Sequence, residues 1–112
     1  MLHFAANLSF LYNDVAFTER FAAASKDGFK GVEYLFPYEF DSLDLAKALK
    51  DNGLQQVLFN APPGGTDRAS MSLAWEQGVR GTTCLPGHEA EFRSGFLTAL
   101  EYAEVMNCPR IH

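Results

Sequence analysis

The fold is decided by the stretch Gly28-Phe29-Lys30-Gly31-Val32-Glu33-Tyr34-Leu35-Phe36-Pro37-Tyr38. Gly28 is the residue type that ends a helix, a short apolar run follows it, and Pro37 stops that run. An apolar run with these boundaries is typical of a strand that leaves a helix, crosses a buried sheet and ends at a loop. We therefore predict a strand over Gly31 to Leu35, with the carboxylate of Glu33 in its middle.

Three further stretches predict strands in the same way. Leu2 to Leu8 is a short apolar run that contains Asn7, and Leu54 to Asn60 is an apolar run that follows Gly53. The second of these fits a strand buried on both faces, as in parallel sheets covered by helices. Arg110-Ile111-His112 opens a fourth run, so we expect the chain to be the opening portion of a repeated strand–helix fold.

Apolar residues at helical spacing predict helices between these strands. The three stripes are Phe17, Phe21 and Ala24; Leu45, Ala48 and Leu49; and Phe92, Phe96, Ala99, Ala103 and Met106. Asn13-Asp14 and Asp41-Ser42 are expected to cap the first two helices, and Gly28 and Asn52-Gly53 to end them. The third helix is predicted over His88 to Met106, with Asn107 ending it and acidic residues in its first turn, where they suit the helix dipole.

The order of elements is strand, helix, strand, helix, strand, long loop, helix, strand. Alternation at this spacing implies parallel strands joined by right-handed crossovers. Two α/β architectures fit that order: a doubly wound open sheet and part of a (β/α)8 barrel. The first strand is followed by Asn7-Leu8-Ser9-Phe10, which does not match the glycine-rich G-x-G-x-x-G phosphate loop, so a dinucleotide-binding fold is disfavoured.

The segment 61–87 interrupts the alternation with prolines, glycines and no clear period. A segment of this length without structure is uncommon inside a compact domain and is usually functional or disordered. Because it follows a strand, it is expected on the active-site face of a barrel, with a short helix over Met71 to Gln77. Trp75 and Arg80 are predicted to close over a small anionic substrate, and a disordered insertion is the alternative.

Composition places the chain among globular proteins of one domain, residues 1–112. Of its 112 residues 47% are hydrophobic and 21% are charged. The net charge of −5 and the lack of a basic cluster argue against nucleic acid and anionic membrane surfaces as partners. The N-terminus lacks the basic region of a signal peptide, and no apolar run is long enough for a membrane helix. Cys84 and Cys108 are expected to be free thiols in a reducing cytoplasm.

Four polar residues lie at or near the carboxyl ends of the predicted strands: Asn7, Glu33, Asn60 and His112. In a (β/α)8 barrel the active site is built at the C-terminal ends of the strands, so these are the candidate substrate-binding residues. Asn7 and Asn60 have an alternative role as caps of turns. Glu33 points to the opposite face from its strand neighbours, where a buried carboxylate needs a partner, a metal ion or water. A structural ion pair with a residue outside this sequence is the alternative for Glu33.

No catalytic constellation is visible, so neither catalytic residues nor metal ligands are assigned. The chain contains no H-E-x-x-H, C-x-x-C or P-loop pattern and no Ser-His-Asp arrangement. Most acidic residues fall on helix surfaces, so a pair of catalytic carboxylates cannot be assembled at the strand ends. His3 is expected to be a hydrogen-bonded core histidine, and His88 a surface residue.

Several motifs, taken together and in this order, resemble hydroxypyruvate isomerases. They are Phe4-Ala5-Ala6-Asn7-Leu8-Ser9, Glu19-Arg20-Phe21-Ala22-Ala23-Ala24, Gly28 to Tyr38, Leu58-Phe59-Asn60-Ala61-Pro62-Pro63-Gly64, Leu85-Pro86-Gly87-His88-Glu89-Ala90-Glu91-Phe92-Arg93, Ala99-Leu100-Glu101-Tyr102-Ala103 and Cys108-Pro109-Arg110-Ile111-His112. The resemblance covers nearly the whole chain except the middle of the long loop.

The resemblance implies the N-terminal part of a xylose-isomerase-like (β/α)8 barrel, with three strand–helix units and the start of a fourth strand. It also implies interconversion of hydroxypyruvate and tartronate semialdehyde, or of a related 2-oxo-tetronate, by proton transfer. Relatives use two glutamates and a divalent metal ion, which lie on later strands and cannot be carried over to residues here. What carries over is a supporting wall of Asn7, Glu33, Asn60 and the Pro62-Pro63-Gly64 loop.

These inferences leave two interpretations open. In the first, the chain is part of an isomerase that acts on a small 2-oxo acid and is inactive alone. In the second, it is a non-catalytic truncated half-barrel that acts as a pairing module. Both predict self-association or association with a missing C-terminal half, because an incomplete barrel leaves sheet edges unpaired.

Overall fold

The computed structural model describes all 112 residues, Met1–His112. Three short strands, β1 (Ala5–Asn7), β2 (Gly31–Glu33) and β3 (Gln55–Leu58), form one sheet in the order β1-β2-β3. Both pairings are parallel, which confirms the orientation predicted from the alternation of strands and helices.

A fourth strand begins beside β3. Phe59 and Ile111 form a parallel bridge. His112 N donates to Phe59 O at 2.9 Å, and Ala61 N donates to His112 O at 2.7 Å. The predicted fourth strand is therefore present at its first residues and extends the sheet on the β3 side.

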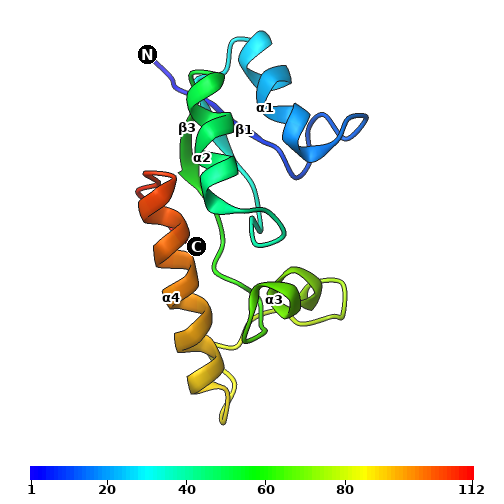
Figure 1. Ribbon diagram of the computed structural model, residues 1–112, viewed down its shortest axis with the longest axis vertical. Coiled ribbons are helices and arrows are strands. Elements are labelled where there is room, and N and C mark those ends of the chain that lie inside the picture. The colour runs from blue at the N-terminus through cyan, green and yellow to red at the C-terminus, as the bar shows by residue number, and fades with distance from the viewer.

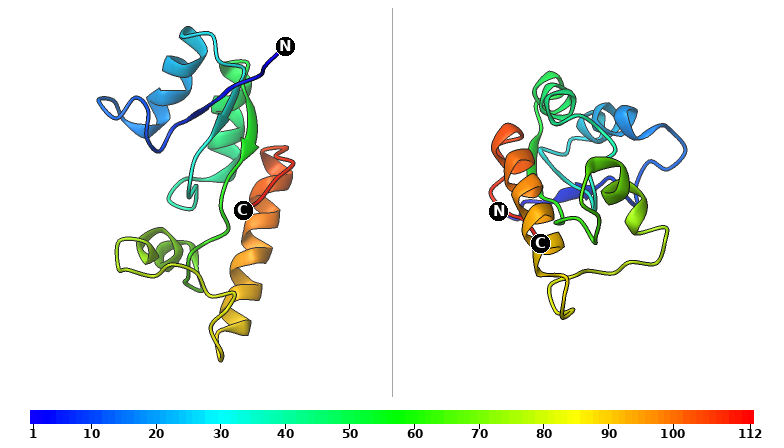
Figure 2. Two further views of the ribbon diagram at one scale, coloured as in Figure 1. Left: turned by 180° about the vertical axis from the view of Figure 1, so that it is seen from behind. Right: turned by 60° about the horizontal axis from the view of Figure 1, so that its bottom comes forward.

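Helices cover one face of this sheet and extend beyond it. Their bounds are α1 Phe17–Lys26, α2 Ser42–Asp51, α3 Arg68–Ala74 and α4 Glu89–Val105. In Figure 1, α3 and the chain around it lie beyond the carboxyl ends of the strands, beside the first half of α4. The view from behind in Figure 2 shows the same separation between α3 and the pair α1–α2. The segment after β3 thus lies at the sheet edge where a barrel carries its active site.

The core lies between the sheet and the helices. Ala6 and Val32 are register partners on neighbouring strands, and both are fully buried, as is Phe21 of α1. Full burial of a side chain such as valine or phenylalanine contributes about 1.5–3 kcal/mol. Tyr34 is also buried here and meets Phe21 edge to face, with ring centroids 6.0 Å apart. Glu33 lies between Val32 and Tyr34 and so points to the opposite face, as predicted.

The strands are shorter than the apolar runs that predicted them. In β2 the predicted end was Leu35, but Leu35 N donates to Ser9 Oγ at 2.9 Å and Leu35 O accepts from Asn60 N at 2.8 Å. The Leu35 amide thus bonds to the Ser9 side chain and not to a neighbouring strand, and β2 ends two residues before the predicted end. The first strand was predicted from Leu2, but residues 1–4 of the chain are exposed and lie outside β1.

The predicted cap of α1 at Asn13-Asp14 is wrong. The helix begins later, with Ala16 at the N-cap and Glu19 Oε2 accepting from Ala16 N at 3.2 Å. Asn13 instead donates from Nδ2 to Phe10 O at 3.0 Å and stabilises the preceding turn. For α2 the prediction is confirmed, because Leu43 N donates to Asp41 Oδ1 at 2.9 Å.

The buried face of α4 is rotated from the predicted stripe. Ala99 and Met106 are buried as expected, but Phe96 is 38% exposed. Gly95 faces inward instead, and a Cβ placed there would lie 3.4 Å from Pro62 Cγ. The close approach of Pro62 to this glycine decides which side of α4 is covered. None of the helices is both long enough and apolar enough to cross a membrane.

Candidate active site

Asn7 and Glu33 meet at the carboxyl ends of β1 and β2. They are register partners, and Asn7 Nδ2 donates to Glu33 Oε1 at 3.1 Å. Ser9 N donates to Asn7 Oδ1 at 3.0 Å, so the same amide also caps the turn that follows β1. The turn-capping role considered for Asn7 is therefore present, and the same side chain also contacts Glu33. Within this chain the partner of the half-buried Glu33 is this amide and not a cation.

Asn60 and His112 line a cavity of about 430 Å³ at the ends of β3 and the fourth strand. Its other polar lining comes from Arg80, Thr82 and Thr83, and its aromatic walls are Phe36, Trp75 and Phe92. The Asn60 backbone is fixed by its neighbours, because Tyr38 Oη donates to Asn60 O at 2.6 Å. Burial raises the pKa of Tyr38, so its hydroxyl stays protonated and remains a donor.

The side chain of Asn60 makes no hydrogen bond within the chain, so it does not act as the turn cap considered as an alternative. Its amide retains donors and an acceptor for a ligand in the cavity. His112 is exposed at the same cavity, and its imidazole likewise makes no hydrogen bond to the protein.

The segment 61–87 forms one wall of this cavity and contains a helix. The predicted helix at Met71 begins three residues earlier, at Arg68, because Asp67 caps it: Ser70 N donates to Asp67 Oδ1 at 2.8 Å. Just after it, the Arg80 guanidinium carbon lies 3.7 Å from the centre of the Trp75 ring. The Trp75 ring in turn packs against Phe36 of the β2–α2 loop, with centroids 5.4 Å apart.

His88 and Glu91 connect the start of α4 to the loop after β3, a contact that sequence reasoning missed. His88 Nδ1 lies 2.7 Å from Glu91 Oε2, and Gly65 N donates to Glu91 Oε1 at 2.7 Å. The Gly65 amide, and then His88, hold the pKa of Glu91 below its usual value. The expected surface position of His88 is correct in exposure but incomplete. The spacing of three residues between His88 and Glu91 at a helix start was the available signal.

Gly64 and Gly65 allow the close approach that this connection requires. A Cβ on Gly64 would lie 2.7 Å from Val79 Cγ1, and one on Gly65 would lie 2.6 Å from Met71 N. Gly65 also has a φ of +97°, which side chains with a Cβ rarely adopt. The Pro62-Pro63-Gly64 motif therefore brings the cavity wall back onto the sheet edge.

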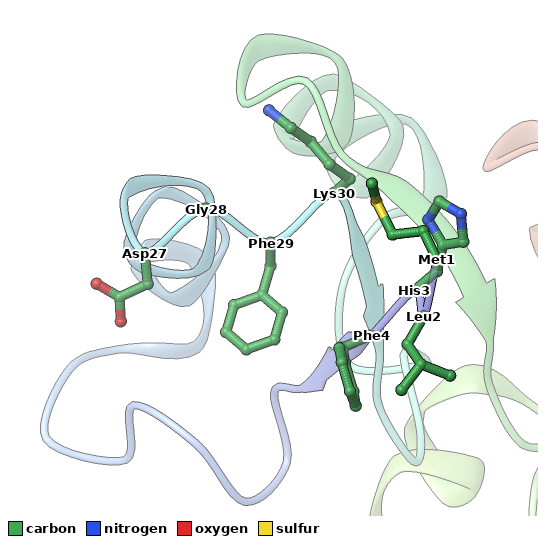
Figure 3. A pocket seen from close by; sticks show the side chains of 8 residues that line it. All are labelled: Met1, Leu2, His3, Phe4, Asp27, Gly28, Phe29 and Lys30. Atoms are coloured by element: carbon green, nitrogen blue, oxygen red, sulfur yellow. The ribbon is translucent and has the colours of Figure 1, made fainter.

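A second cavity, of about 340 Å³, lies at the amino ends of β1 and β2. Figure 3 shows that the charged ends of Asp27 and Lys30 point away from the Phe4 ring, and Asp27 accepts a hydrogen bond from Tyr12 Oη at 2.9 Å. His3 lines this cavity, is exposed and makes no hydrogen bond, so the expectation of a hydrogen-bonded core histidine is wrong. This cavity lies opposite the edge that carries the candidate site.

The predicted site residues thus form two pairs along one sheet edge. Asn7 contacts Glu33, and Asn60 shares a cavity with His112. No group of three or more histidine, cysteine, aspartate or glutamate side chains is placed to hold a metal ion. The family resemblance places the divalent metal site on later strands, and the strand ends of this chain offer only the single carboxylate of Glu33.

Comparisons with known proteins cover the whole chain. It is 52% identical over 112 residues to a 2-oxo-tetronate isomerase of Cupriavidus necator and 40% identical over 112 residues to a hydroxypyruvate isomerase of Escherichia coli. A solved structure, described as an AP endonuclease of family 2 from Brucella melitensis, matches all of the chain with a TM-score of 0.90 and 46% identity. No protein-family model matches the chain.

The parallel sheet, its polar carboxyl edge and the structural match define part of a (β/α)8 barrel of the xylose-isomerase-like class. Within that class, the chain is similar along its whole length to 2-oxo-tetronate and hydroxypyruvate isomerases. It spans about 40% of the length of these relatives and of the Brucella melitensis protein.

Proposed function

We propose that this chain supplies part of the substrate-binding wall of an isomerase. The reaction is the interconversion of hydroxypyruvate and tartronate semialdehyde, or of a closely related 2-oxo-tetronate. The observation that carries this proposal is Glu33, held by Asn7 at the carboxyl edge of the sheet in a chain whose full sequence matches isomerases. The Brucella melitensis structure is described as an endonuclease, but a net charge of −5 disfavours a phosphodiester backbone as the substrate here.

The reaction moves one proton between neighbouring carbons. A base removes a proton from the hydroxymethyl carbon of hydroxypyruvate, which gives an enediolate, and an acid returns a proton to the carbon that was the ketone. The hydroxymethyl carbon becomes the aldehyde as its hydroxyl proton is transferred to the former ketone oxygen, so the protons balance and no oxidant is needed. Following the family resemblance, we place the acid–base groups outside these 112 residues.

The residues of this chain bind and orient the substrate in this proposal. Glu33 Oε1 is occupied by Asn7, and its second oxygen remains free to accept a hydrogen bond from a substrate hydroxyl. Asn60 and His112 offer unpaired polar groups to the oxygens of a bound molecule in the adjacent cavity. Free thiols at Cys84 and Cys108 agree with a reducing cytoplasm as the site of action.

The 112-residue chain alone is expected to show no isomerase turnover and to self-associate. Its strand ends supply one carboxylate, β1 leaves one sheet edge unpaired, and α4 exposes Phe96, Leu97 and Leu100. A turnover assay with hydroxypyruvate and sedimentation at micromolar concentration measure the two expectations. Steady turnover that Glu33→Gln abolishes would contradict the first, and a clean monomer with sharp thermal unfolding would contradict the second.

The proposed function is tested in a chimera in which residues 1–112 replace the matching segment of the Cupriavidus necator relative. Turnover of hydroxypyruvate or of a 2-oxo-tetronate by the chimera is the expected result. A chimera that folds but isomerises neither compound, beside an active parent enzyme, would argue against the proposal.

A further inference from the structure

Arg80 carries a positive charge that no acid in the chain neutralises. The ion pairs of the structure join Lys47 to Asp51, Arg68 to Asp41 and His88 to Glu91, and none of them includes Arg80. Arg80 nevertheless lines the cavity at the carboxyl edge of the sheet. In a chain of net charge −5, an unpaired guanidinium at this position marks a place for an anion.

The guanidinium is held in place by contacts with uncharged groups. Nη1 donates to Trp75 O at 2.6 Å and to Val79 O at 3.0 Å, and the group stacks on the Trp75 ring. Phe36 packs against the same ring from the β2–α2 loop. Nε and Nη2 make no hydrogen bond within the chain. The fork is therefore oriented before any ligand binds, and three of its five N–H donors, those on Nε and Nη2, remain free.

The rest of the cavity suits a small hydroxylated acid. No acidic side chain lines it. Asn60, Thr82 and Thr83 place amide and hydroxyl groups in the lining, and Thr82 is almost fully buried. Glu91, the acid that belongs to the same region, is occupied by Gly65 and His88.

We infer that Arg80, oriented by Trp75, binds the carboxylate of a small 2-oxo acid and selects acids over neutral hydroxyketones. The naming of the acid as a 2-oxo acid rests on the proposed function, whereas the carboxylate site rests on Arg80 and its cavity. Arg80 is thus a specificity-determining residue, and Trp75 is its positioning residue. The segment that carries both residues forms one wall of the cavity, and its closure over the substrate stays a prediction.

Fluorescence titration of the 112-residue chain tests this inference, because Trp75 is its single tryptophan. The probes are hydroxypyruvate and its neutral counterpart dihydroxyacetone, at constant ionic strength, with calorimetry as a second measure of binding. We expect saturable binding of hydroxypyruvate and at least tenfold weaker binding of dihydroxyacetone, since a hydrogen-bonded charge pair is lost.

Three variants separate the charge from its geometry. Arg80→Gln should weaken hydroxypyruvate binding about tenfold or more, and Arg80→Lys should weaken it severalfold because an ammonium lacks the planar fork. Arg93→Gln is the matched control, since Arg93 is an exposed arginine of α4 that lies outside the cavity. Circular dichroism checks the fold of each variant, and Arg80→Lys keeps the test decisive if Arg80→Gln does not fold.

Equal binding of hydroxypyruvate by the wild type and the Arg80 variants would overturn the inference. So would equal binding of dihydroxyacetone, or no binding of hydroxypyruvate by the wild type. The outcome is separable from that of the proposed function. If Arg80-dependent binding is found while the chimera has no turnover, the carboxylate site stands and the isomerase assignment fails. If the chimera turns over and Arg80→Gln leaves its KM unchanged, the isomerase assignment stands and the carboxylate site fails.

Discussion

The sheet with α1 and α2 and the wall formed by residues 61–87 are stabilised in different ways. In the first region, apolar side chains repeat along strands and helices and bury one another, as Ala6, Val32 and Phe21 do. In the second, α3 is short and the path of the chain depends on single contacts. Examples are the Gly65–Glu91 hydrogen bond and the approach of Pro62 to Gly95.

This difference shows how each region positions its residues in the candidate site. The repeated packing of the first region brings the strand ends together and so presents Asn7 and Glu33 side by side. The single contacts of the second region place Arg80 and Trp75 over the neighbouring strand ends. One region supplies the frame of the site and the other supplies its wall, and each can be disturbed separately.

The largest effect is expected from the core of the first region. Phe21→Ala should lower the free energy of unfolding by about 3–5 kcal/mol, because Phe21 is fully buried and contacts the rings of Phe17 and Tyr34. Phe96→Ala is the matched control and should cost only about 1 kcal/mol, since Phe96 is part exposed and stacks mainly on Phe92. Urea unfolding measures both. A larger loss for Phe96 would restore the helix face predicted from the sequence.

A smaller and more local effect is expected from Gly65 in the wall. Gly65→Ala should cost about 3 kcal/mol, because the residue has a positive φ and its Cβ would meet the Met71 backbone. Gly78→Ala has a similar φ of +89° but open space around the Cβ, and should cost about 1 kcal/mol. Urea unfolding gives the two costs, and hydrogen exchange shows whether residues 61–87 loosen before β2 does. Equal costs at the two glycines would show that the close approach is unimportant.

These predictions also show which features of the structure could be predicted from the sequence. Apolar periodicity is sufficient for the order of elements, the parallel sheet and the shared edge of Asn7, Glu33, Asn60 and His112, because strand ends in such a sheet must meet. Strand lengths were overestimated, since loop groups such as Ser9 Oγ take the backbone partners of an apolar residue at the strand end. Periodicity carries no information about that competition.

The sequence predicted the face on which residues 61–87 lie, but it did not predict the contacts that these residues make. The stacking of Arg80 on Trp75 and the bond from Gly65 to Glu91 depend on the path of an aperiodic segment. The signals available were local: Asp67 three residues before Ser70 as a helix cap, and the paired glycines after two prolines. The rotation of α4 was missed because a glycine on the buried face adds nothing to an apolar stripe.

The smallest effect is expected from the pH dependence of the Glu91 contact. Its folded-state pKa is lowered by the Gly65 amide and by His88, so the contribution to stability is complete above the ordinary carboxyl pKa of about 4.3. That contribution is lost as the pH falls through the lowered pKa of Glu91. Thermal midpoints measured from neutral to acid pH should fall less steeply for Glu91→Gln than for the wild type. Glu101→Gln, at an exposed position of α4, should leave the profile unchanged, and a wild-type profile for Glu91→Gln would contradict the role of this contact.

The most direct test of the account is the kcat/KM of the chimera with Glu33→Gln compared with that of Glu39→Gln. Glu33 is bound by Asn7 at the sheet edge, whereas Glu39 is an exposed acid of the following loop. Loss of a hydrogen bond to a charged group costs about 1.5–3 kcal/mol, so Glu33→Gln should lower kcat/KM about tenfold or more. Glu39→Gln should leave it within about twofold of the unmodified chimera. Equal kcat/KM values for Glu33→Gln and the unmodified chimera would contradict the assignment of this edge to the substrate.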